Sequence, residues 1–198
     1  MVQAPSIQDI EAARQAFETN EPRDLFYRAA TELVTLALDG KTSLSVTEAL
    51  AVLLQTWNKM FYQYRRFDSQ HFADIERLIR DRYSILIAFR QQSIESLNQD
   101  DEKVTSLFRA FEEVLGPVGA AKCLHLLAPR FFPLWDRAIA KAYGLPLEKM
   151  GRNAGRYCRF MGIVKGQIQS LGGEQVIGRN PLKAIDEYNY CKYTKGQI

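Results

Sequence analysis

Apolar residues recur every three or four positions along most of the chain, which is the spacing of one face of a helix. The first such run covers residues 6–17, and a second one follows Pro22. A third run, residues 46–66, is apolar on most sides and follows Ser45 and Glu48, which have the spacing of a capping box. The pattern therefore predicts three helices in the first third of the chain, with the third one central.

The same spacing continues through the rest of the chain, interrupted by loop signals. Asp68 is suited to cap a fourth helix that runs towards Ser96, and residues 98–103 read as a polar loop. Glycine and proline interrupt the pattern at 116–119 and 129–133. The remaining helices are expected at residues 104–115, 120–128, 136–144 and 179–193, with one or two more within the glycine-interrupted stretch 147–173.

No segment alternates apolar and polar residues with β-branched enrichment, so no strand is expected. The predicted fold class is all-α: a compact bundle of about eight or nine helices with a helix-hairpin-helix near residues 116–119. We expect a single all-helical domain over residues 1–198, in which the one candidate seam between two lobes lies near 97–103.

Charge is distributed unevenly, although the net charge is only +3. Residues 1–121 hold 13 Lys and Arg against 18 Asp and Glu, whereas residues 122–198 hold 13 against 5. A basic face of this kind favours a partner rich in phosphates, such as DNA. The alternative is that the basic part of the chain docks on the acidic part, and the sequence leaves both open.

Other composition signals narrow the class of protein. The three cysteines are scattered without CxxC spacing, which argues against a disulfide framework or a structural zinc site, and two histidines exclude a multi-histidine metal site. No metal is expected. The first residues lack a signal-peptide pattern, and no run approaches the roughly 18 apolar residues of a membrane span. We therefore expect a cytoplasmic protein without a membrane partner.

The largely apolar stretch 115–145 contains Lys122, His125 and Asp136. Lys122 and His125 are three residues apart and share a helix face. Each residue has an ordinary structural interpretation: a lysine that reaches solvent, a hydrogen-bonded packing histidine, and an N-cap aspartate. The preceding Gly-Pro-Val-Gly is either a plain helix connection or a hairpin whose backbone N–H groups receive an anion.

This stretch resembles the helix-hairpin-helix DNA glycosylase superfamily. In that family a hairpin of the form L-P-G-[VI]-G leads into a helix with a catalytic lysine, and a V-D-x-H-[VI]-x-R segment carries a catalytic aspartate. The chain has L-G-P-V-G at 115–119, then Lys122, then L-W-D-R-A-I-A-K at 134–141. It differs in the transposed Gly and Pro, a lysine one residue further on, an interval of 14 residues between Lys122 and Asp136, and Ala138 in place of histidine.

The resemblance implies a nucleic-acid-acting protein for DNA repair, in which a nucleotide flips into a pocket between helices. Lys122 would attack the sugar as a neutral amine and Asp136 would assist, with His125 and Trp135 at the pocket. The backbone of Gly116, Val118 and Gly119 would hold a DNA phosphate, either directly or through a bound monovalent cation. That cation is the one cofactor that the resemblance implies. Further phosphate contacts would come from Arg137, Lys141, Arg152, Arg156 and Arg159, the last three being spaced for one helix face.

Two other functions fit the same residues. One is a non-catalytic helical domain that binds nucleic acid through the hairpin and the basic final third. The other is a helical protein-interaction module without a nucleic-acid role, in which the motif belongs to the core. The sequence leaves open whether the protein is an enzyme, which base it would excise, and its oligomeric state.

Overall fold

The computed structural model describes residues 4–22, 24–98, 101–178 and 180–198. Within these ranges it contains ten α-helices, a 3-10 helix and a π-helix, and no strand, which confirms the all-α fold class. In chain order the elements are α1 (Ile7–Asn20), α2 (Asp24–Leu38), α3 (Val46–Trp57), α4 (Lys59–Tyr62), α5 (Ser69–Arg90), η1 (Ile94–Ser96), α6 (Glu102–Leu127), α7 (Arg137–Ala142), α8 (Ala154–Ser170), α9 (Glu174–Ile177), α10 (Pro181–Asn189) and η2 (Tyr190–Lys195).

Side-chain caps begin the helices where the sequence predicts them. Ser45 and Glu48 form the expected capping box: the Glu48 N–H donates to Ser45 Oγ (3.2 Å) and the Ser45 N–H donates to Glu48 Oε2 (2.7 Å). Asp68 caps α5, and Asn180 caps α10 ahead of Pro181 at the first helical position. These starts follow from local chemistry alone.

The predicted helices at 46–66 and 69–96 end early, and this partly explains why there are ten rather than eight or nine. The first one stops at Trp57, and after Asn58 only the short α4 continues. Asn58 is buried, and its side-chain amide donates to the Leu115 carbonyl (3.5 Å). The second one ends at Arg90, followed by the 3-10 helix η1. At the end of α3, a tertiary contact of Asn58 thus accompanies the early end of the helix.

Helix α6 is two helical halves joined at Gly116, whose φ of 70° and ψ of 168° are non-helical. This single-residue kink stands where the sequence predicts a hairpin. A Cβ on Gly116 would lie 3.1 Å from the Phe61 ring, and one on Gly119 would lie 2.6 Å from the Asn58 amide. Both positions therefore favour glycine, because Phe61 of α4 and Asn58 between α3 and α4 pack directly on the kink.

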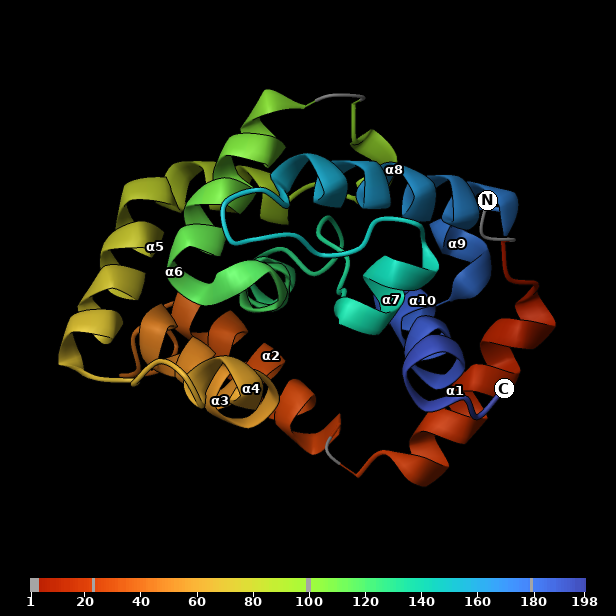
Figure 1. Cartoon of the computed structure of the whole chain (residues 1–198), viewed down its shortest axis with the longest axis horizontal. Coiled ribbons are helices and arrows are strands. Elements are labelled where there is room, and N and C mark those ends of the chain that lie inside the picture. The colour runs from red at the N-terminus through yellow and green to blue at the C-terminus, as the bar shows by residue number, and fades with distance from the viewer. Residues whose placement is uncertain (1–3, 23, 99–100, 179) are drawn as a thin grey trace.

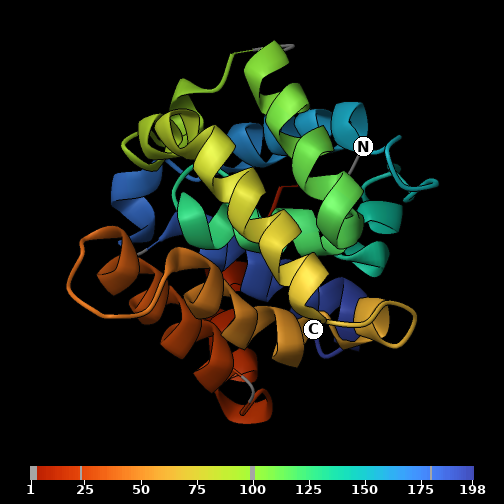
Figure 2. The ribbon, with the colours of Figure 1, turned by 90° about the vertical axis from the view of Figure 1, so that its left-hand side faces the viewer.

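The two ends of the chain lie together. Helix α1 packs on α10, and the terminal η2 contacts α7, so the first and last elements form one side of the molecule (Figure 1). Helices α2 and α3 pair with each other, and α5 packs against α6 and α3 (Figure 2). One cluster of buried apolar side chains runs from Ile10 to Tyr188 and joins the two sides. The predicted seam at 97–103 includes residues 99 and 100, which lie outside the described residues.

A buried carboxylate fixes the start of α8. Glu112 on α6 is fully buried and accepts hydrogen bonds from the backbone N–H of Asn153 (3.2 Å) and from its side-chain amide (2.5 Å). Asn153 Oδ1 in turn accepts from the Glu148 N–H (2.7 Å). This contact holds the loop between α7 and α8 against the core.

Candidate functional site

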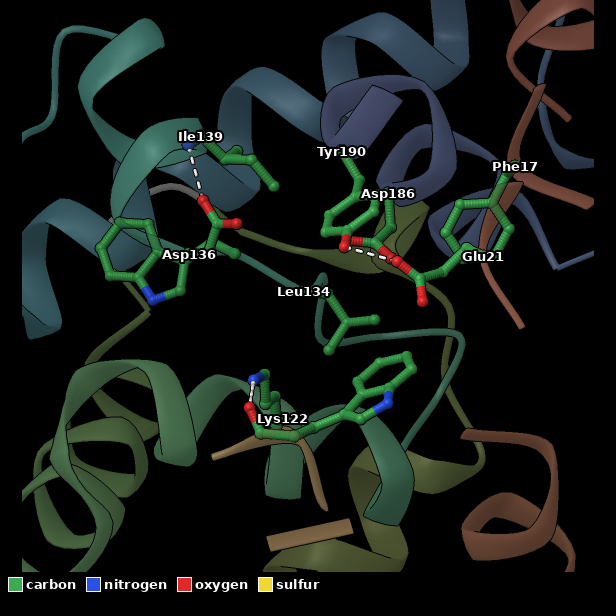
Figure 3. A pocket seen from close by; sticks show the side chains of 10 residues that line it. Phe17, Glu21, Lys122, Leu134, Asp136, Ile139, Asp186 and Tyr190 are labelled. Carbon is green, nitrogen blue, oxygen red and sulfur yellow. Dashed lines mark hydrogen bonds between the residues drawn. The ribbon is translucent and has the colours of Figure 1, made fainter. Parts of the chain in front are cut away.

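A pocket of about 150 Å³ opens where α1, α3, α6, α7 and α10 converge (Figure 3). Aromatic side chains form much of its wall: Phe17, Trp57, Trp135 and Tyr190. The charged residues in the wall are Glu21, Lys122, Asp136 and Asp186. The pocket therefore combines apolar ring surface with one amine and three carboxylates, drawn from segments more than 160 residues apart in the chain.

Lys122 reaches this pocket from the second half of α6. Its Nζ donates a hydrogen bond to the main-chain oxygen of Trp57 and lies 5.8 Å from the centroid of the Trp57 ring. Trp57 is the last residue of α3, and the final carbonyls of a helix have no donor within it. Lys122 thus satisfies the end of α3 and lines the pocket at the same time.

Asp136 lies at the start of α7 and confirms the predicted N-cap. Its Oδ1 accepts from the Ile139 N–H (2.8 Å), and its Oδ2 accepts from the Thr194 hydroxyl in η2 (2.9 Å). The neighbouring Trp135 donates from Nε1 to the Pro117 carbonyl (3.1 Å), which ties the loop before α7 to the kink in α6. Lys122, Asp136 and Trp135 all line the pocket, as the sequence led us to expect.

His125 lies behind the pocket rather than in its wall, which corrects the prediction. It is fully buried, with Nδ1 2.8 Å from the Phe132 carbonyl and Nε2 2.9 Å from the Tyr27 hydroxyl. Because a carbonyl only accepts, Nδ1 carries the hydrogen and Nε2 accepts from Tyr27. Burial lowers the pKa of His125 to about 4, so it is a neutral packing residue.

Three residues that the sequence did not single out complete the pocket: Glu21 directly after α1, Asp186 on α10 and Tyr190 at the start of η2. Tyr190 donates its hydroxyl hydrogen bond to Glu21 Oε2 (2.7 Å), and Lys195 Nζ lies 3.9 Å from the same oxygen. Asp186 stands one helical turn before Tyr190. Asp186 and Tyr190 are four residues apart within the helix predicted at 179–193, so they share one face of it. This spacing is the one signal in the sequence that links them.

Lys183 supplies the nearest cation to Asp186. Its Nζ lies 3.1 Å from Asp24 Oδ1, 3.6 Å from Glu187 Oε1 and 4.0 Å from Asp186 Oδ2. It also lies 4.1 Å from the centroid of the Phe17 ring. Burial is the main cause that raises the pKa of Asp186 to about 7, and the charge of Lys183 opposes that rise only in part.

The kink does not present its glycines for a phosphate or a cation. Gly116 and Gly119 are buried against Phe61 and Asn58, and Val118 is half-buried. Their packing accounts for both glycines without a bound ion, so the role in phosphate binding expected for this segment is not supported by its surroundings.

Four of the five basic residues predicted to contact phosphate are exposed, and the fifth, Arg156, is half-buried. Arg137 and Lys141 are exposed on α7, beside the pocket residue Asp136, and Arg159 is exposed on α8. Arg152 is exposed but precedes α8, so it does not continue the helix face of Arg156 and Arg159. This corrects the expected three-residue stripe. Arg156 is half-buried and forms an ion pair with Glu148.

Other chemistry is limited in the part of the chain that the structure describes. No group of three or more His, Cys, Asp or Glu side chains there is arranged to hold a metal ion. Cys123, Cys158 and Cys191 form no disulfide. No helix among the described residues is long and apolar enough to cross a membrane.

Comparison with models of known protein families, with curated proteins and with solved structures finds no match for this chain.

Proposed function

We propose that this chain acts on nucleic acid by excising a base at the pocket, with Lys122 as the nucleophile and Asp136 as its assistant. The observation that carries the proposal is that these two residues, from separate helices, line one pocket with aromatic walls. The resemblance at 115–145 named the same pair from sequence. Their place in one pocket supports the proposal, because such chemistry needs an amine and an acid at the same cavity.

The size and lining of the pocket support a single ring as the bound group. A volume of about 150 Å³ equals that of an engineered protein cavity that binds benzene. The rings of Phe17, Trp57 and Trp135 provide surfaces on which a flat ligand stacks. We therefore expect a pyrimidine-sized base to fit better than a two-ring purine.

The proposed step conserves atoms and charge. Nζ of Lys122, as a neutral amine, forms a bond to the sugar C1′, while the bond from C1′ to the base breaks and the base leaves with the electron pair. Asp136 takes the proton that the amine loses. The sugar ring then opens: the nitrogen lone pair forms the C1′=N bond, and O4′ leaves with the electrons of the C1′–O4′ bond and takes the proton from Asp136. Borohydride reduces the resulting protonated imine to a stable adduct.

The exposed basic side chains beside the pocket support a polyanionic partner. Arg137 and Lys141 stand on α7 directly after Asp136. Cations at this place would hold a phosphate backbone while the base enters the pocket. Binding should weaken steeply as salt rises from 50 to 200 mM, by about tenfold for every two phosphates contacted.

A second candidate is a non-catalytic nucleic-acid-binding domain. The observation that favours it is that Lys122 and Asp136 also have structural contacts, since Lys122 donates to the end of α3 and Asp136 caps α7. If the chain does not bind duplex DNA, or binds it without sensitivity to salt, the third function follows: a helical protein-interaction module without a nucleic-acid role.

Borohydride trapping on duplexes with single uracil, thymine glycol or 8-oxoguanine lesions tests the proposal. Lys122→Arg keeps a cationic donor for the Trp57 carbonyl but lacks the primary amine, so it should fold, bind duplex and lose at least 100-fold of the adduct. Lys103→Ala is the matched control, because Lys103 is an exposed lysine at the other end of α6.

The outcomes separate the candidates. Adduct from the wild-type chain and from Lys103→Ala, but not from Lys122→Arg, supports base excision through Lys122. Duplex binding without adduct in any variant favours the non-catalytic domain. Adduct that persists in Lys122→Arg excludes Lys122 as the nucleophile.

A further inference from the structure

The three carboxylates of the pocket differ in what holds them. Glu21 accepts from the Tyr190 hydroxyl, and both oxygens of Asp136 accept hydrogen bonds. Within the described ranges no group donates a hydrogen bond to the Asp186 carboxylate, and its closest cation, Lys183, lies 4.0 Å away. Asp186 is thus the pocket carboxylate that accepts no hydrogen bond from the described residues, so both of its oxygens can bond to a ligand.

Asp186 is also nearly withdrawn from water, because only 9% of the residue is exposed. A carboxylate that is buried without donors is unfavourable in its charged form, and a ligand that shares or takes its proton relieves this cost. Its position in the wall beside Tyr190 directs that exchange to the pocket (Figure 3).

Charged and titratable groups from several segments either line the pocket with Asp186 or form ion pairs with Lys183 or Glu21. They are Glu21 after α1, Asp24 on α2, Lys122 on α6, Asp136 before α7, Lys183 and Glu187 on α10, and Tyr190 and Lys195 in η2. Glu187 and Asp136 favour the protonated form of Asp186, whereas Lys183 and Lys122 favour the charged form. Together with burial, these charges raise the pKa of Asp186 to about 7, so it carries a proton for much of the time at neutral pH.

We propose that Asp186 is the proton-donating acid of this pocket and that it protonates the base as the bond to the sugar breaks. The inference rests on the proposed function for the identity of the acceptor. It adds to that function a division of labour, in which Asp136 accepts a proton from the amine and Asp186 gives one to the base.

The step is balanced. As C1′ passes from the base nitrogen to Nζ of Lys122, the electron pair of the broken bond stays on the base and binds the proton of Asp186. The base leaves neutral, and Asp186 remains as a carboxylate near Lys183. Proton exchange with water restores the acid for the next turnover.

The rate of borohydride-trapped adduct from a uracil duplex, measured from pH 5 to 9, tests the role. The wild-type rate should fall as pH rises through about 7, when Asp186 loses its proton. Asp186→Asn should lower the rate about 100-fold and remove that decline, because an amide donates no proton. Asp81→Asn, at an exposed acid on α5, should match the wild type.

A carboxyl ¹³C NMR titration of the aspartates gives a second measurement that does not need activity. It should show one resonance with a midpoint near 7 that is missing from Asp186→Asn and that shifts when free uracil is added. This measurement also shows whether the variant is folded, since the other aspartate resonances should keep their positions.

Each result decides the inference. An unchanged rate and pH profile in Asp186→Asn overturns it while leaving Lys122 chemistry intact. If no chain forms adduct, the proposed function fails, and the titration then decides by itself: a resonance that titrates near 7 and responds to uracil supports Asp186 as the acid of the pocket. The absence of such a resonance overturns it.

Discussion

His125 and Asp186 are both buried titratable residues near the same pocket, but they differ in their hydrogen-bond partners. Burial drives each towards its neutral form, lowering the pKa of His125 to about 4 and raising that of Asp186 to about 7. The ring nitrogens of His125 are both engaged by protein groups, Phe132 and Tyr27. Asp186 lines the pocket with no hydrogen-bond donor among the described residues.

The contrast teaches that burial alone does not mark a functional residue. A buried polar group whose hydrogen bonds are filled by the protein stabilises the fold, and removing it leaves its partners unsatisfied. A buried polar group that faces a pocket without donors costs stability and gains a use only when a ligand arrives. Both pKa shifts favour the neutral form of the residue, so the hydrogen-bond partners and not the shifts distinguish the two cases.

The largest expected difference between the two residues is in the free energy of unfolding when each one is replaced. His125→Ala should lower the free energy of unfolding by about 3 kcal/mol, because it opens a cavity and removes the hydrogen bonds that His125 makes to the Tyr27 hydroxyl and the Phe132 carbonyl. Asp186→Asn should cost nothing measurable at pH 7, since it removes a poorly satisfied carboxylate. Urea unfolding of both variants checks this, and equal losses would break the contrast.

The next effect is a pair of opposite pH slopes. As pH falls from 6.5 towards 4 the unfolded chain binds the proton of His125 first, so that residue makes stability fall with acid. As pH rises from 3.8 towards 7 the folded chain keeps the proton of Asp186 longer, so that residue makes stability fall with alkali. Each slope reaches at most about 1.4 kcal/mol per pH unit.

Unfolding of the wild type, His125→Gln and Asp186→Asn at several pH values between 4 and 7 separates the two contributions. In the wild type they partly cancel. His125→Gln should shift the slope of stability against pH downwards, and Asp186→Asn should shift it upwards. Two variants that shift the slope in the same direction would contradict one of the two assignments.

The smallest effect concerns one hydrogen bond. Tyr27→Phe removes the hydroxyl that donates to Nε2 of His125 and should lower the free energy of unfolding by about 1 kcal/mol. Tyr83→Phe is the matched control, because Tyr83 is 44% exposed on α5 and should change stability by less than about 0.5 kcal/mol. Thermal unfolding of the two variants in one buffer is sufficient, and equal losses would show that the buried bond adds nothing.

The sequence foretold much of the helical framework and part of the pocket. Ser45, Asp68 and Asp136 were identified as helix starts because capping depends on side chains within three residues. Lys122, Trp135 and Asp136 were identified because they belong to one short stretch of chain. His125 was assigned to the wrong place, since helical spacing gives a common face with Lys122 and not what covers that face.

What the sequence determined by itself is the set of local features: an all-helical chain, its main capped helices and a glycine-rich break in α6. Only the tertiary structure brought Glu21, Asp186 and Tyr190 to Lys122 and Asp136, because that meeting depends on α1 packing against α10 across nearly the whole length of the chain. It also decided that Gly116 and Gly119 accommodate Phe61 and Asn58. The physical reason is that helix formation is governed by neighbours in sequence, whereas burial and hydrogen-bond partners are governed by which surfaces the folded chain brings into contact.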